Sequence, residues 1–143
     1  MKIVDLNAND IDKILKLYSL YFDDGWNKNM LTGAFNSNRF FAIGLQEEDL
    51  VGVITYSLSD VDADIEGLVI SKEYRNKGLA LFLLSELEKR LKGENVQKVF
   101  LEVRESNIPA KNLYIKNGYQ QINLRKSYYN DGENAIVMAK ELI

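Results

Sequence analysis

The chain has 143 residues, 18 basic and 21 acidic side chains for a net charge of −3, and 46% hydrophobic residues. This length fits a single domain, 1–143, which buries about two thirds of its surface on folding. The weak negative charge argues against a nucleic-acid partner. No apolar run approaches the ~20 residues of a membrane span, so we expect a cytoplasmic protein without a membrane partner, either monomer or homodimer.

Two residue types are absent from the chain, and their absence restricts the chemistry. Without Cys there is no disulfide, no thiolate nucleophile and no acyl-cysteine intermediate. Without His there is no Ser-His-Asp triad and no His-based zinc site. We therefore expect no metal, and any acid–base step must use Asp, Glu, Lys or Tyr.

The first half of the chain predicts a strand, two helices and a β-hairpin. The opening strand covers 2–6, and Asn9 or Asp10 caps the helix that follows. This helix has one apolar face and breaks at 23–25, and a second, weaker helix covers 26–35. Strands at 40–45 and 50–58, joined by a short acidic turn, predict an antiparallel pair. The apolar face of the first helix consists of Ile11, Ile14, Leu15, Tyr18 and Phe22.

Four acidic residues alternate with apolar ones in the segment 59–66, so an extended backbone would point all four in one direction. They are Asp60, Asp62, Asp64 and Glu66. A calcium loop is rejected, because Ile65 stands where an EF-hand needs Gly and Ser71 where it needs Glu. Two interpretations remain: an acidic rim that attracts a cationic amine, or the solvated face of a hairpin tip.

The segment 67–91 predicts a short strand, a basic turn and a long helix. Leu residues recur at helical spacing from position 79 to position 91. The turn carries Arg75 and Lys77, and Gly78 precedes the helix. Free N–H groups in the first helical turn, the helix dipole and a residue without a side chain favour binding of a phosphate. The alternative is an ordinary turn with solubilising charges.

The second half predicts a strand at 96–103 with apolar residues on both faces, which indicates a central, covered position. A helix capped by Asn107 follows, and two final strands cover 119–125 and 134–142. Two strands separated by a helix predict a right-handed parallel crossover. The element order β-α-α-β-β-β-α-β-α-β-β indicates a mixed α/β fold with one central sheet flanked by helices.

Several motifs in this order resemble the GNAT family of N-acetyltransferases. Arg75-x-x-Gly78-x-Ala80 resembles the R/Q-x-x-G-x-G/A motif that binds the pyrophosphate of acyl-CoA. The stretch 101–119 resembles the LEVRxSN…A…LYxxxGF block of the bacterial ribosomal-protein-alanine N-acetyltransferase branch, and 128–138 resembles the closing YY…DAxxM segment of that branch. The resemblance weakens before Glu66, where Gly25-Trp26 replaces Pro-Trp of the branch.

The resemblance implies a GNAT fold, acetyl-CoA as co-substrate, and direct transfer of its acetyl group to a primary amine. It implies that coenzyme A binds the backbone of one strand, the basic turn with the start of its helix, and the residue that caps the next helix along the chain. These residues are Leu68, Val69, Ile70, Arg75, Asn76, Lys77, Gly78, Leu79, Ala80 and Asn107.

The resemblance also implies a catalytic pair. Glu102 would be the base that deprotonates the amine, and Tyr114 the acid that protonates the leaving sulfur. Independently, a carboxylate within an apolar strand is expected to have a raised pKa. The alternatives are a Glu102 that pairs with a nearby cation, Arg104 or Lys126, and a Tyr114 that only packs in the core.

The acceptor side is implied less specifically. Tyr128 and Tyr129 resemble the loop tyrosines that hold a peptide N-terminus, or they are plain hairpin-tip aromatics. Glu66 is a second candidate for the base. The leading acceptor is a protein N-terminal α-amine. The alternatives are a small amine, such as a polyamine, an aminoglycoside or an amino acid, and a coenzyme-A-binding sensor without turnover.

Overall fold

The computed structural model describes residues 1–20 and 26–142. The predicted positions of Phe22 and of the break at 23–25 lie outside this range. The element order matches the predicted one, with two added 3-10 turns at Ala8–Asp10 and Lys72–Tyr74. The strands are β1 (Lys2–Leu6), β2 (Phe40–Gln46), β3 (Leu50–Ser59), β4 (Asp62–Ile70), β5 (Lys98–Arg104), β6 (Gln120–Arg125) and β7 (Ala135–Glu141), and the helices are α1 (Ile11–Ser19), α2 (Lys28–Asn36), α3 (Leu79–Gly93) and α4 (Ile108–Lys116).

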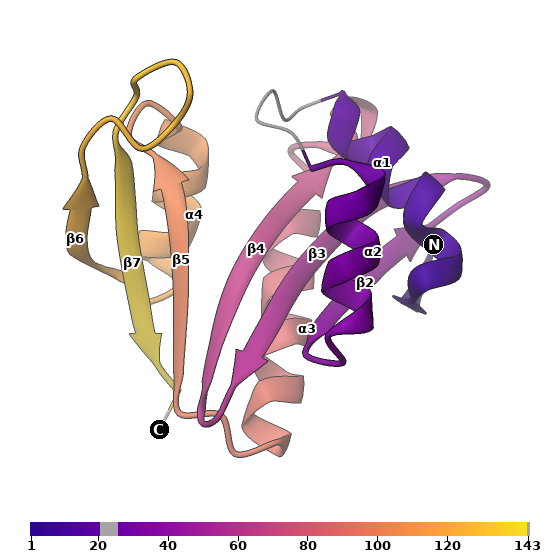
Figure 1. Ribbon diagram of the computed structural model, residues 1–143, viewed down its shortest axis with the longest axis horizontal. Coiled ribbons are helices and arrows are strands. Elements are labelled where there is room, and N and C mark those ends of the chain that lie inside the picture. The colour runs from indigo at the N-terminus through magenta and orange to yellow at the C-terminus, as the bar shows by residue number, and fades with distance from the viewer. Residues whose placement is uncertain (21–25, 143) are drawn as a thin grey trace.

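The seven strands form one sheet in the order β1-β2-β3-β4-β5-β7-β6. All neighbours are antiparallel except β4 and β5, which are parallel as the intervening helix predicts. Their pairing covers only four residue pairs, from Asp62 with Lys98 to Ile65 with Leu101. Beyond these pairs the two strands diverge, so the sheet opens like a V towards the carboxyl ends of β4 and β5 (Figure 1).

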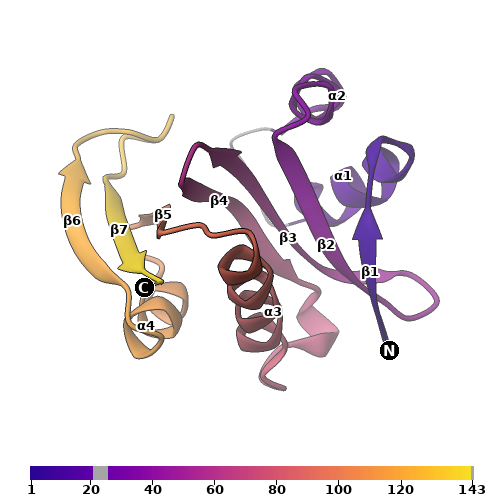
Figure 2. The same cartoon turned by 90° about the horizontal axis from the view of Figure 1, so that it is seen from below.

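Helices cover both faces of the first half of the sheet. α1 and α2 lie on one face, and α3 lies on the opposite face, with α4 beside it under the second half (Figure 2). Each covered face has its own apolar cluster, one that includes Ile14, Leu17 and Val53 under α1, and one that includes Leu83 and Leu87 of α3. Burial of these clusters stabilises the two layers against the sheet.

Four local predictions differ from the structure. Asp10 occupies the N-cap position of α1 but makes no side-chain cap bond there; the side-chain cap is Asn7, at the start of the preceding 3-10 turn. Helix α2 starts at Lys28 after the cap Asn27. Gly93 belongs to the last turn of α3, and the left-handed residue that follows is Asn95. The acidic segment forms most of β4 and not only a hairpin tip, because Ala63 and Ile65 are buried between its acidic residues.

A fifth difference concerns β5. Val99, Leu101 and Val103 are buried on the face of α3, whereas Glu102 on the opposite face is exposed. β5 is central in the sheet but covered on one face only. Among residues 1–20 and 26–142, no helix has the length and apolar character needed to cross a membrane.

Candidate active site

The gap between β4 and β5 leaves backbone groups of β4 without a partner strand. The N–H of Ser71 donates to Val51 of β3, and alternate residues of a strand direct their N–H and C=O groups to opposite sides. The backbone groups of Leu68 and Ile70 therefore point away from β3, into the gap. The side chain of Arg75 confirms this direction, because its Nε donates to the carbonyl of Ile70 at 2.9 Å.

One hollow of about 590 Å³ lies on the α3 side of the gap, and we call it the helix-side hollow. Arg75, Asn76 and Gly78 form its rim, next to the free N–H groups at the start of α3. Gly78 has a left-handed backbone with φ of 76°, and a Cβ built there meets open space, so a ligand can approach its backbone closely. The rest of the lining consists of Leu68, Val69, Ile70, Tyr74, Leu79, Ala80, Leu81, Asn107, Pro109, Ala110, Leu113 and Tyr114.

A second hollow of about 270 Å³ lies on the other side of the gap, and we call it the acidic hollow. Glu66 and Glu102 line it, together with the aromatic rings of Trp26 and Tyr129. The helix-side hollow and the acidic hollow share four lining residues: Leu68, Asn107, Ala110 and Tyr114. The two hollows thus meet inside the gap, beside the hydroxyl-bearing side chain of Tyr114.

Tyr114 projects from α4 and is 6% exposed. Burial raises its pKa, so its hydroxyl group stays protonated at neutral pH. No hydrogen bond joins this hydroxyl to another residue of the described chain, and the hydroxyl is therefore available to a ligand at the junction of the two hollows. Asn107 accepts a hydrogen bond from the N–H of Ala110 at 3.2 Å, so it caps α4 as predicted and lines both hollows as well.

Glu66 occupies a distortion of β4. Gly67 pairs with Thr55, and Ile65 pairs with the next residue of β3, so Glu66 is the extra residue of a β-bulge. Ser57 donates to its Oε1 at 2.8 Å, and Oε2 has no hydrogen-bond partner among the described residues.

The environment of Glu66 favours its protonated form. Partial burial of the carboxyl group raises the pKa of Glu66, and the hydrogen bond from Ser57 lowers it. The negative charges of Asp64 and Glu102 raise it further. A carboxylate with a raised pKa is a stronger proton acceptor than an ordinary one.

Glu102 has a different environment from the one the sequence suggested. Its side chain is 32% exposed and forms an ion pair with Arg125, in which Nε donates to Oε2 at 2.9 Å. The hydroxyl of Tyr128 donates to Oε1 at 3.2 Å. Glu102 thus pairs with a cation, as the alternative interpretation stated, but the cation is Arg125 and neither Arg104 nor Lys126. Arg104 instead binds Asp131 and Glu133.

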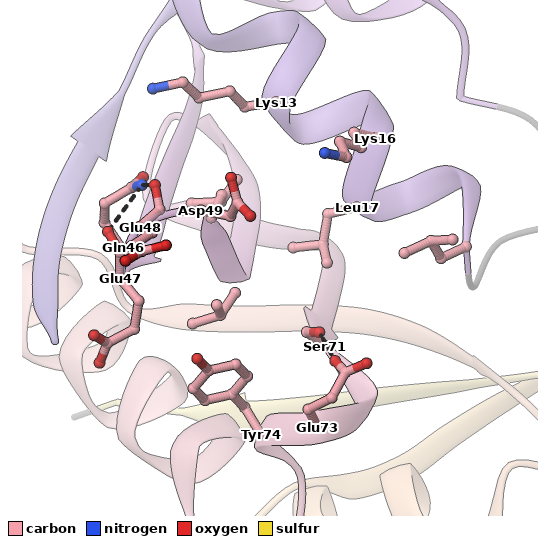
Figure 3. A pocket seen from close by; sticks show the side chains of 13 residues that line it. Lys13, Lys16, Leu17, Gln46, Glu47, Glu48, Asp49, Ser71, Glu73 and Tyr74 are labelled. Carbon is pink, nitrogen blue, oxygen red and sulfur yellow. Dashed lines mark hydrogen bonds between the residues drawn. The ribbon is translucent and has the colours of Figure 1, made fainter.

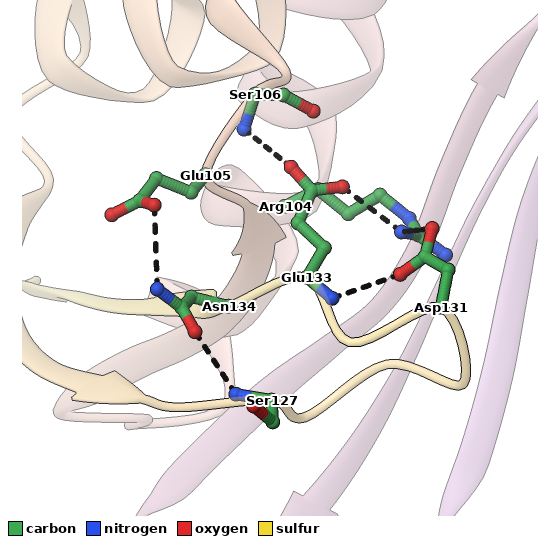
Figure 4. Close-up of polar contacts among 7 residues, drawn as sticks. All are labelled: Arg104, Glu105, Ser106, Ser127, Asp131, Glu133 and Asn134. Atoms are coloured by element: carbon green, nitrogen blue, oxygen red, sulfur yellow. Dashed lines mark hydrogen bonds and ion pairs between the residues drawn. The ribbon is translucent and has the colours of Figure 1, made fainter.

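The tyrosine loop, residues 126–134 between β6 and β7, forms the outer wall of the acidic side. The ring of Tyr129 lies 4.1 Å from the guanidinium carbon of Arg104, and the rings of Tyr128 and Tyr129 meet edge-on at 5.2 Å. A polar network fixes the loop to the end of β5 and the start of α4 (Figure 4). It consists of Arg104, Glu105, Ser106, Ser127, Asp131, Glu133 and Asn134.

Other hollows lie next to this region or apart from it. The outer hollow, of about 510 Å³, continues from the acidic hollow towards solvent and is lined by Trp26, Met30 and Tyr128 among others. A separate hollow of about 530 Å³ lies between α1 and the turn that joins β2 to β3 (Figure 3). It contains none of the predicted site residues, and its charged lining residues, such as Lys13 and Glu48, are exposed.

The structure brings almost every predicted site residue to the gap. Of the residues predicted to bind coenzyme A, Lys77 alone does not line the helix-side hollow, and its Nζ lies over the ring of Tyr74 at 5.3 Å. Asp64 belongs to the acidic segment that the sequence already marked as a possible rim for a cationic amine, whereas sequence reasoning missed Ser57, Met30 and Arg125. The basic residue before the tyrosine pair was a visible signal for Arg125, but Ser57 and Met30 carry no local pattern.

An open seam in a mixed sheet, with a basic loop and a helix N-terminus on one side and carboxylates on the other, suits an enzyme that transfers an acyl group from a phosphate-bearing carrier to an amine. The family model described as the acetyltransferase (GNAT) family matches residues 11–119. The chain therefore belongs to the GNAT family and is an N-acetyltransferase.

Individual relatives agree with this assignment. The chain is 29% identical to an N-alpha-acetyltransferase of Saccharolobus solfataricus, over 94% of this chain and 89% of that protein. It is 36% identical to the ribosomal protein bS18-alanine N-acetyltransferase of Haemophilus ducreyi, over 66% of this chain and 67% of that protein. The crystal structure of the ribosomal-protein-S18-alanine N-acetyltransferase from Escherichia coli matches with a TM-score of 0.87 and 26% identity, over 99% of this chain and 93% of that one.

Proposed function

We propose that this enzyme transfers the acetyl group of acetyl-CoA to the α-amine of a protein N-terminus. The observation that carries the proposal is the meeting of two chemically different hollows at Tyr114, inside the gap between β4 and β5. The relatives named as N-alpha-acetyltransferases and ribosomal-protein-alanine N-acetyltransferases support the same acceptor class.

The residues of the helix-side hollow fit acetyl-CoA. The free N–H groups at the start of α3, together with Arg75, suit a pyrophosphate. The gap-facing backbone of Leu68 and Ile70 offers donors and acceptors to an amide-containing arm, as a neighbouring strand would. When bound, acetyl-CoA supplies an activated acetyl group and a thiol leaving group.

The residues of the acidic hollow fit an amine that must lose a proton. Glu66 can accept this proton at Oε2, whereas both oxygens of Glu102 are engaged, by Tyr128 and Arg125. We therefore assign removal of the amine proton to Glu66. The role of Glu102 is to hold Arg125 and Tyr128 at the wall of the acceptor site. Tyr114 holds a proton at its hydroxyl group for the leaving sulfur.

The chemistry of the base favours an α-amine over the alternatives. An α-amino group has a pKa of about 8, whereas a lysine or polyamine ammonium is near 10. A carboxylate with a raised pKa, such as Glu66, is better matched to the α-ammonium, which is the more acidic of the two. The tyrosine loop and the outer hollow also give an extended acceptor, such as a peptide, more surface than a small amine needs.

The test is acetyl-CoA-dependent thiol release with a panel of acceptors. The panel contains peptides that start with Ala, Ser or Met, the same peptides with a blocked α-amine and one internal lysine, spermidine and an aminoglycoside. We expect turnover of the free N-terminal peptides and not of the blocked ones. Preference for spermidine or the aminoglycoside would contradict the proposed acceptor, and coenzyme A binding without any turnover would favour a sensor.

A further inference from the structure

A pair of buried hydroxyl groups lies directly behind the candidate active site. Tyr18 of α1 is 1% exposed, and Thr55 of β3 is fully buried, the one buried polar residue besides tyrosines in the described chain. Their hydroxyl oxygens are 2.5 Å apart. The proposed chemistry uses neither group, and a buried hydrogen bond between distant segments fixes their relative position more strictly than apolar packing does.

The Tyr18 hydroxyl lies against the backbone of β4 at the residue that follows Glu66. A Cβ added to Gly67 would stand 2.6 Å from the Tyr18 oxygen and 3.2 Å from the Thr55 oxygen. Only glycine fits this close approach. The hydroxyl pair is therefore packed onto the β-bulge, where the ladder with β3 is interrupted and cannot itself hold Glu66.

Tyr18 also interacts electrostatically with the bulge. Burial raises the pKa of Tyr18, the hydrogen bond with Thr55 lowers it, and the negative charge of Glu66 raises it. The phenol of Tyr18 therefore stays neutral, and its hydroxyl group remains packed against the bulge. On its other side, the ring of Tyr18 lies 6.3 Å from the ring of Trp26, which lines the acidic hollow.

We propose that Tyr18 is a positioning residue for acetyl transfer: with Thr55 as hydrogen-bond partner and Gly67 as contact, it supports the bulge and directs Glu66 into the acidic hollow. This inference rests on the proposed role of Glu66 as proton acceptor. It adds α1 to a site whose other groups come from the strands, α2, α4 and the tyrosine loop.

The experiment compares Tyr18→Phe, Thr55→Val and the double variant with a control, Tyr119→Phe. Tyr119 is also buried, and its hydroxyl donates to Glu88 at 2.9 Å. We expect Tyr18→Phe to lower kcat by about ten- to hundredfold, because small misplacements of a reacting group have effects of this size. The KM for acetyl-CoA should not change, and Tyr119→Phe should keep kcat within about twofold.

The double variant separates positioning from stability. Each single variant leaves one buried hydroxyl without this partner and should lower the melting temperature, whereas replacing both groups restores much of it. We expect the double variant to regain stability but not kcat. If it regains both, or if Tyr119→Phe lowers kcat as much as Tyr18→Phe, the positioning role is wrong.

A second measurement is independent of the acceptor. NMR titration of the Glu66 carboxyl in Tyr18→Phe should give a pKa closer to the ordinary glutamate value than in the wild type, because a relaxed bulge rehydrates the carboxylate. An unchanged pKa would overturn the inference. The kinetic comparison of the variants uses whichever amine the wild-type enzyme acetylates. If the wild type uses none, the proposed function fails, and this titration alone decides the role of Tyr18.

Discussion

Glu66 and Glu102 face the same hollow from neighbouring strands, and the residues around them give them different capacities to accept a proton. Ser57 contacts one oxygen of Glu66, whereas Arg125 and Tyr128 take one oxygen each of Glu102. Side-chain alternation in a strand predicts that both point to the same face, but it does not predict these partners. At the scale of single residues, the sequence identifies the two candidates, and the structure shows that their hydrogen-bond partners differ.

Replacing each carboxylate by its amide tests this separation. Glu66→Gln should lower kcat by about 10²- to 10⁴-fold, the usual contribution of a general base. Glu102→Gln should mainly raise the KM for the peptide, because it weakens the contacts with Arg125 and Tyr128. Steady-state kinetics with an N-terminal peptide measure both effects. The opposite pattern would return the role of base to Glu102.

The raised pKa of Glu66 also predicts a stability effect. The folded state holds the Glu66 proton more tightly than the unfolded state, so the free energy of unfolding falls as pH rises through the range between the two pKa values. At pH 7 the charged carboxylate is therefore a destabilising feature. We expect Glu66→Gln to raise the melting temperature slightly at pH 7 and to leave it unchanged well below the ordinary glutamate pKa. Calorimetry at both pH values checks the sign.

At the scale of elements, the tyrosine loop depends on an anchor outside itself. Arg104 at the end of β5 binds Asp131 and Glu133, and its guanidinium lies against the ring of Tyr129. The N–H of Ser106 donates to Glu133 at 2.8 Å, which ties the loop to the start of α4 as well. The end of β5 and the start of α4 thus both hold the tyrosine loop in place (Figure 4).

Arg104→Ala should release the tyrosine loop without unfolding the domain. We expect the peptide KM to rise about tenfold or more, because a flexible acceptor wall must be ordered on binding. The KM for acetyl-CoA should stay constant, because Arg104 does not line the helix-side hollow. Arg39→Ala is the control, since the side chain of Arg39 donates to the carbonyl of Leu58 and lines neither hollow of the gap. Equal effects of both variants on the peptide KM would contradict this role of the loop.

Element types were predictable from the sequence, whereas their edges were not. Periodicity gave every helix and strand, since apolar spacing distinguishes a helix from a strand. β4 was predicted too short because Asp62 and Asp64 obscured the buried Ala63 and Ile65. β5 was expected to be covered on both faces, because a strand pattern does not reveal where a covering helix ends.

At the scale of the whole molecule, the enzyme consists of a sheet that is continuous at one end and divided at the other. The order of elements predicts the parallel contact between β4 and β5, but not that it ends after four residue pairs. No local pattern in the sequence predicts the β-bulge at Glu66 or the twist of the sheet. The gap and its two hollows therefore required the structure.

Ligand binding across the gap should stabilise the whole domain. Coenzyme A at 100 times its Kd should add about 2.7 kcal/mol to the free energy of unfolding. Gly78→Asp should abolish this gain, because it places a negative charge at the helix N-terminus and a side chain on a backbone with φ of 76°. Thermal denaturation with and without coenzyme A measures both. A full gain in Gly78→Asp would remove the helix N-terminus from the binding site.

The short β4–β5 ladder has a consequence for amide exchange with solvent. β4 is the fourth strand of a seven-stranded sheet, yet the amides of Leu68 and Ile70 face a gap. In hydrogen–deuterium exchange they should lose protection as fast as the amides of an outer strand, while those of Ala63 and Ile65 stay protected. Occupation of the gap would slow this exchange, so the two amides would report directly on the loaded state of the enzyme.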